Sequence, residues 1–232
     1  MSNLTEKAVP MKLKQLCKPL ALAVAVAALS AGAMASPITY AESVGGTGLL
    51  PGTAEVVAGG AENGLTILGN LDDGRGGFGP NLVDMFRFSV GQAGTYFFDT
   101  FGSVIPDPAL FLFDSAGNGL YWNNDASVTP SITQSSFATT LGLGNYYIAL
   151  AFYGLDADDG AGSIFNTLAN EGPALAGTGA VVGWNDFYGQ NIYDNISYRI
   201  NIQVPEPGAL ALSLAALGLL AGFSRRRQAT LA

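Results

Sequence analysis

The chain has 232 residues, of which 49% are hydrophobic and only 12% are charged. Its 31 glycines favour turn-rich β structure over long helices, and its length suggests one sizeable domain with accessory segments. With no histidine and one cysteine, the chain lacks the commonest general base and the ligands of the usual zinc, copper and haem sites. Most familiar enzyme chemistries are therefore excluded.

The first 35 residues have the layout of a secretory signal peptide. Lys12, Lys14 and Lys18 precede the apolar run 20–29, and small residues follow as far as Ala33 and Ala35. The apolar run is too short to span a bilayer as a helix. We therefore predict export, with cleavage by signal peptidase after Ala35, at the site formed by Ala33 and Ala35.

The other end of the chain, the segment 205–232 with Val204 directly before it, holds three ordered parts. They are the motif Val204-Pro205-Glu206-Pro207, an uncharged apolar stretch, and the cluster Arg225-Arg226-Arg227. This combination resembles the PEP-CTERM sorting signal. The resemblance implies that an exosortase, a membrane-embedded cysteine transpeptidase, recognises the tail, cuts near the Pro-Glu-Pro motif and passes the domain toward the cell surface.

The physical properties of this tail agree with the resemblance. The apolar stretch 208–224 predicts a single transmembrane helix, although at about 1.5 Å per residue it only just spans a hydrocarbon core of about 30 Å. The arginine cluster is expected to stay in the cytoplasm, so the domain before it faces outward. Pro205 and Pro207 keep the preceding segment extended and accessible. A permanent membrane anchor is the alternative interpretation.

The domain between the two ends is strongly acidic. Residues 36–204 contain sixteen acidic residues and three arginines, a net charge of −13. Such a surface repels nucleic acid and anionic lipid headgroups and attracts cations. We therefore expect no nucleic-acid partner.

Strand patterns recur through this domain. Residues 198–204 alternate apolar and polar side chains, and 85–90 do the same before a turn at 91–94 that leads into 95–100, which predicts a hairpin. Other apolar runs are separated by Gly, Asn, Asp and Pro; they lie at 65–68, 109–113, 136–141, 145–152 and 180–184. We predict an all-β, antiparallel, jelly-roll-like β-sandwich over 65–204, with a Gly/Ala-rich lead-in at 36–64 and a long loop at 156–179.

Part of this domain resembles the bacterial pre-peptidase C-terminal domain, a small β-sandwich found beside secreted peptidases. The matching residues are Asp84-x-Phe86-x-Phe88, Gly94-x-Tyr96, Asp107-Pro108-x-Leu110-x-Leu112-Phe113-Asp114-x-x-Gly117, Asn124-Asp125 and Leu143-Gly144-x-Tyr146-Tyr147-Ile148. The resemblance implies a non-catalytic accessory or binding module, sometimes stabilised by calcium.

Several aspartates are candidate calcium ligands, since calcium prefers six to eight oxygens. The candidate set is Asp72, Asp73, Asp84, Asp114 and Asp125. The preferred interpretation is plainer: these carboxylates cap their own turns in solvent. The run 156–160 is not an EF-hand, because a glycine stands at its fifth position and no glutamate closes the loop.

Two clusters combine a tryptophan with short polar side chains, as sugar-binding surfaces do. They surround Trp122 and Trp184. The plainer alternative is an aromatic residue at a strand end, followed by an Asn/Asp turn. The leading hypothesis is thus an exported, non-enzymatic protein of the cell surface or extracellular matrix, associated with exopolysaccharide or biofilm. The alternative is a calcium-dependent module that binds carbohydrate or protein, and a secreted hydrolase is the weakest option.

Overall fold

The computed structural model describes residues 37–43, 48–72, 81–128, 131–166, 168–186 and 195–204. All of them belong to one compact unit, Ala35–Pro205. Three predicted features lie outside the described residues: the signal peptide at 1–35, the sorting segment at 205–232 and Asp73.

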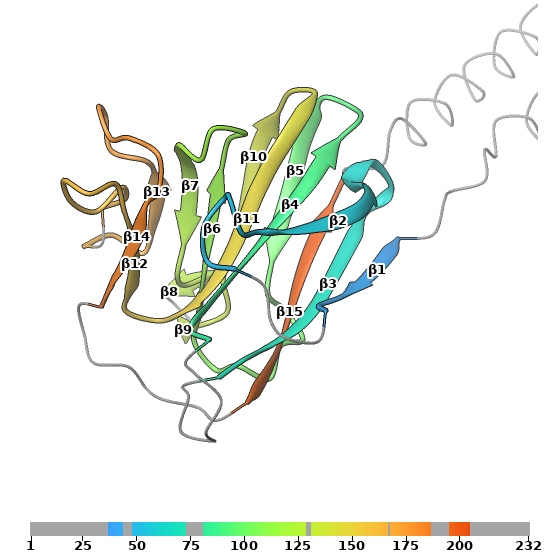
Figure 1. Cartoon of the computed structure of the whole chain (residues 1–232). Helices are drawn as coiled ribbons and strands as arrows, with labels where there is room; N and C mark the ends of the chain where they lie inside the picture. The colour runs from blue at the N-terminus through green and yellow to red at the C-terminus, as the bar shows by residue number, and fades with distance from the viewer. Residues whose placement is uncertain are drawn as a thin grey trace, which may run out of the picture. The chain divides into compact units, whose positions relative to one another are not determined.

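The strands form two main sheets (Figure 1). The first has the order β1 (Ile38–Ala41), β3 (Leu65–Leu71), β15 (Ile196–Gln203), β5 (Gly94–Asp99) and β10 (Ser136–Leu141). The second has the order β13 (Glu171–Pro173), β7 (Gly119–Asn123), β6 (Pro108–Phe113), β11 (Gly144–Phe152), β4 (Val83–Val90) and β2 (Glu55–Gly60). Two small sheets pair β12 (Leu155–Asp158) with β14 (Gly183–Asp186) and β8 (Ser127–Val128) with β9 (Ser131–Ile132), and η2 (Ala61–Asn63) is a short 3-10 helix.

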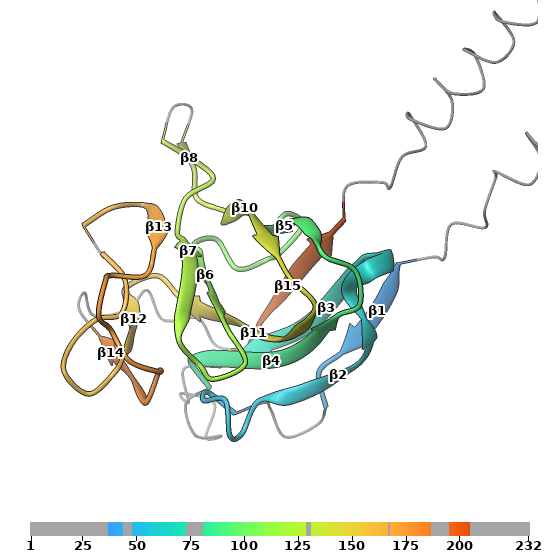
Figure 2. The same cartoon turned by 90° about the horizontal axis from the view of Figure 1, so that it is seen from above.

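The two main sheets pack face to face as a β-sandwich, as the sequence predicts (Figure 2). Their pairing is antiparallel, except that β1 runs parallel to β3 and β2 runs parallel to β4. Phe88 of β4 and Phe98 of β5 meet edge to face across the interface, with ring centroids 6.2 Å apart. This contact lies in the core, where both rings are buried.

Strand β15 has the buried face that its alternating sequence predicts. Tyr198, Ile200 and Ile202 are buried, while the residues between them are at least partly exposed. The strand pairs with β3 on one side and with β5 on the other, so it lies in the middle of the first sheet. The last described strand of the domain therefore lies in the interior of a sheet and not at its edge.

Strand β6 has a continuous apolar sequence instead of an alternating one, because every residue of this strand is buried. Successive side chains on a strand point to opposite faces, so both faces of β6 are covered. Phe111 and Phe113 contact Phe165 and Trp184, which come from the segment after β11. That segment therefore acts as a third layer over β6.

The predicted hairpin over 85–100 is wrong. Strand β4 pairs with β11 and β2, whereas β5 pairs with β10 and β15, so the turn between β4 and β5 crosses from one sheet to the other. The alternating pattern specifies which face of each strand is buried, and two inward faces can meet across a sandwich as readily as along one sheet.

Two segments predicted to be irregular contain strands. The lead-in at 36–64 contributes β1 and β2, which lie at edges of the two main sheets. The predicted loop at 156–179 contains most of β12 and all of β13. These strands are short, and β12 and β13 contain Asp, Gly and Pro, residues of low strand propensity. They form because neighbouring strands supply hydrogen-bond partners.

Candidate functional site

Of the predicted calcium ligands, Asp72, Asp84, Asp114 and Asp125 lie among the described residues. Among the described residues, no group of three or more His, Cys, Asp or Glu side chains is placed to hold a metal ion. Asp114 instead holds its own turn, where its Oδ1 accepts hydrogen bonds from the backbone of Ala116 (2.8 Å) and Asn118 (2.9 Å). Asp125 lies near Asp107, whose pKa is raised to about 6 by burial and by the charge of Asp125.

Asp84 is fully buried and lies on the inward face of β4. Burial, followed by the nearby Glu42 carboxylate, raises its pKa to about 8, although the Tyr198 hydroxyl and Asn81 act in the opposite direction. The side chain is therefore mostly protonated at neutral pH.

The two predicted tryptophans lie against the same phenylalanine. Trp122 is only 5% exposed and stacks on Phe111, with centroids 5.8 Å apart and planes inclined by 15°. Trp184 is partly buried, and its ring meets that of Phe111 at 78°. Its Nε1 donates a hydrogen bond of 2.7 Å to the carbonyl oxygen of Leu49. Trp122 therefore cannot offer an exposed stacking face to a sugar.

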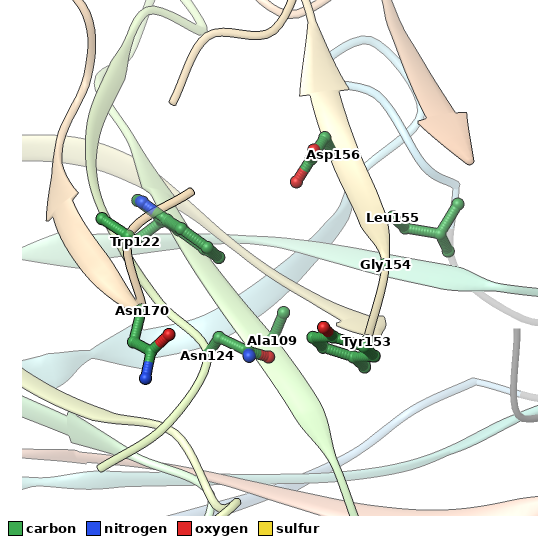
Figure 3. Close-up of a pocket in the computed structure, with 9 residues that line it drawn as sticks. Ala109, Trp122, Asn124, Tyr153, Gly154, Leu155, Asp156 and Asn170 are labelled. Carbon is green, nitrogen blue, oxygen red and sulfur yellow. The ribbon is translucent and has the colours of Figure 1, made fainter. Parts of the chain in front are cut away.

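A small pocket of about 50 Å³ opens beside Trp122 (Figure 3). Its wall includes Trp122 from β7, Asn124 from the turn after it, Tyr153 from the corner between β11 and β12, Asp156 from β12, and Asn170. These residues come from separate parts of the sequence, which is why no local motif predicted the pocket.

Backbone hydrogen bonds and one glycine hold the corner in place. Gly154 has φ of 91°, a left-handed conformation that a residue with a side chain rarely adopts, and it turns the chain from β11 into β12. The amide of Asn124 donates to the carbonyl of Asn170 over 2.8 Å, which joins two sides of the pocket. Strand β12 is further fixed by its antiparallel pairing with β14.

The polar groups of the pocket are buried. Asp156 is 5% exposed and Asn124 is 6% exposed. Burial raises the pKa of Asp156 to about 6, so this carboxylate is largely ionised at neutral pH. The Oδ1 of Asn124 and the Nε1 of Trp122 are buried with no hydrogen-bond partner among the described residues. Asn124 belongs to the cluster around Trp122 that the sequence predicts as a candidate sugar-binding surface, whereas the sequence predicts no binding role for Asp156.

Comparison with protein families matches residues 203–228 to the PEP-CTERM protein-sorting motif. The chain carries a PEP-CTERM sorting signal. The match includes Pro205, Glu206, Pro207 and the arginine cluster 225–227, so the protein is exported through the membrane toward the cell surface or extracellular space, and its tail is a substrate for exosortase. Among the described residues, no helix is long and apolar enough to cross a membrane; the predicted helix at 208–224 lies outside them.

The other comparisons concern the rest of the chain. The chain is similar to the solved pre-peptidase C-terminal domain of a collagenase from Bacillus anthracis, with 10% identity and a TM-score of 0.33. The similarity covers 72% of this chain and 96% of that one. Comparison with curated proteins gives no match.

Proposed function

We propose that this protein is a non-enzymatic component of the cell surface or extracellular matrix, associated with exopolysaccharide or biofilm. Signal peptidase removes the first 35 residues, and exosortase then cuts the tail near Pro205-Glu206-Pro207. Until that cut, Arg225, Arg226 and Arg227 hold the tail in the membrane from the cytoplasmic side.

The observation that carries this proposal is the position of the sorting motif. Strand β15 ends at Gln203, and the matched motif begins at residue 203. Every strand in the part of the chain that the structure describes, and the buried core with it, lies before the Pro-Glu-Pro motif. A cut near the Pro-Glu-Pro motif therefore releases the sandwich with every strand in place.

A non-enzymatic role is supported by the side chains that the domain contains. The sequence has no histidine, and its single cysteine, Cys17, lies in the predicted signal peptide. Asp84, whose pKa burial raises to about 8, faces the interior of the sandwich, where a substrate has no access. What remains suits binding and scaffolding better than acid–base catalysis.

A second candidate function is a carbohydrate- or protein-binding module that depends on calcium. The pocket beside Trp122 favours the binding part of this candidate, because it gathers buried polar groups that lack partners. The calcium part concerns the candidate ligands Asp72, Asp73, Asp84, Asp114 and Asp125. Melting curves in calcium and in chelator test that part directly.

Substitution of the motif tests the leading proposal. Pro205→Ala combined with Glu206→Ala and Pro207→Ala should keep the protein in the membrane fraction. The matched control is Gln203→Ala, which alters the last residue of β15 and leaves the Pro-Glu-Pro motif intact. If the motif variant reached the cell surface as efficiently as the control, the tail would not direct sorting.

A further inference from the structure

We propose that the pocket between β7 and β12 binds the hydroxyl groups of a neutral sugar unit, with Asp156 and Asn124 as hydrogen-bond acceptors. The inference rests on the proposed function for its setting, because it supplies a site by which a surface domain would hold a polysaccharide. It assigns a binding role to residues beyond the two tryptophans.

The first support is the unpaired polar atoms. Asn124 Oδ1 and Trp122 Nε1 are buried, and neither has a partner among the described residues. A buried polar group left without a hydrogen bond costs about 1–3 kcal/mol, so such groups are usually satisfied by water or by a ligand. A ligand that enters this pocket would recover that free energy.

The second support is the arrangement of charge. Figure 3 shows Asp156 on one side of the pocket, with Asn124 and Asn170 on the opposite side. A carboxylate that is 5% exposed can form a strong, charge-assisted hydrogen bond to a hydroxyl group placed between these walls.

The mixture of donors and acceptors identifies the ligand class. The Trp122 N–H and the asparagine amide groups donate, while Asp156 and the amide oxygens accept. A hydroxyl group both donates and accepts, so it satisfies such a wall, whereas a bare cation would be repelled by the N–H groups. Asp156 and the net charge of −13 over 36–204 disfavour anionic sugars. Neutral sugars remain.

The size of the pocket sets how much of the sugar it holds. A cavity volume of about 10–15 Å³ holds one water molecule. A pocket of about 50 Å³ therefore takes a few hydroxyl-sized groups. The pocket therefore holds one edge of a sugar ring. Ala109, Leu155 and Ala169 supply apolar wall for its C–H groups.

Binding of neutral oligosaccharides to the full chain tests the proposal. The chain is kept in a detergent without a sugar headgroup and titrated with glucan, mannan, galactan and N-acetylglucosamine oligomers, and with alginate as the anionic probe. We expect at least one neutral probe to bind more tightly than alginate. Asp156→Asn should weaken that binding about tenfold, because it removes the charge and keeps the shape of the side chain.

Two further variants keep the result interpretable. Ala169→Leu fills the pocket without removing a polar group, so it should also abolish binding even if Asp156→Asn proves unstable. Asp158→Asn, on the same strand but outside the pocket wall, should bind as the parent does. The proposal is overturned if no neutral probe binds, if alginate binds best, or if Ala169→Leu binds normally. None of these outcomes affects tail processing, which is measured by mass and tests the proposed function separately.

Discussion

The indole Nε1 of Trp184 donates a hydrogen bond to the carbonyl oxygen of Leu49 over 2.7 Å. It links strand β14 to the segment before β2, two parts of the chain that lie far apart in the sequence. The bond gives Trp184 a structural role in joining these two segments.

Trp184→Phe should therefore lower the free energy of unfolding by about 1 kcal/mol, since it removes the donor and keeps an aromatic ring. Trp184→Ala should cost about 3 kcal/mol, because it also removes the contact with Phe111. Denaturant unfolding of the full chain measures both. Equal losses in the two variants would mean that the ring contact contributes nothing.

Phe98→Ala should lower the free energy of unfolding by about 3–5 kcal/mol, because the ring is fully buried between the sheets. The neighbouring Phe97, 46% exposed on the other face of β5, is the matched control. Phe97→Ala should cost less than about 1 kcal/mol. A larger loss at Phe97 than at Phe98 would contradict the orientation of β5.

These two phenylalanines illustrate how far the sequence predicts the fold. The alternation of buried and exposed residues locates β4, β5 and β15 and supports a sandwich, since it depends on local side-chain period. It does not specify hydrogen-bond partners, which is why β4 and β5 were wrongly paired. The strands β1, β2 and β13 escape prediction because they are short, have Gly-, Ala- or Pro-containing sequences around them and lie at sheet edges, where pairing depends on a neighbouring strand.

The candidate site shows the same limit. Trp122 was singled out from its local cluster, but the pocket also needs Asp156, which the chain brings near only after β11. Nothing in the local pattern of 156–160 distinguishes a buried carboxylate from its solvated neighbours. Asp114, by contrast, has bonds within its own turn, and its Asp-x-x-Gly pattern is readable in sequence.

Asp114→Ala should lower the free energy of unfolding by about 1–2 kcal/mol, because its carboxylate accepts hydrogen bonds from Ala116 and Asn118. The loss should be the same in millimolar calcium and in chelator, since these bonds stabilise the turn without a metal. A loss seen in calcium alone would make Asp114 a calcium ligand.

Asp84 should make stability fall as pH rises. Its pKa is about 8 in the folded protein, above the ordinary value near 3.8, so the folded state binds a proton that the unfolded state releases. Its stabilising contribution is complete below about pH 4 and is lost as pH rises through 8. Between these two pH values, the free energy of unfolding falls by about 1.4 kcal/mol per pH unit for one proton.

Asp84→Asn should remove that slope. Melting curves of parent and variant should be compared between pH 6 and 8, because Asp107 and Asp156, with pKa values raised to about 6, contribute mainly below this window. The variant should gain stability relative to the parent as pH rises. Parallel curves in this window would show that Asp84 is ionised in the folded protein.

The central claim is that the tail is a sorting signal that is cut and that the sandwich is delivered without it. Intact mass of the protein recovered from the cell surface measures this most directly. In cells with active exosortase, the mass should correspond to a chain that begins after Ala35 and ends near Pro205-Glu206-Pro207. A surface protein that still carries Arg225, Arg226 and Arg227 would contradict the claim and identify the tail as a permanent anchor.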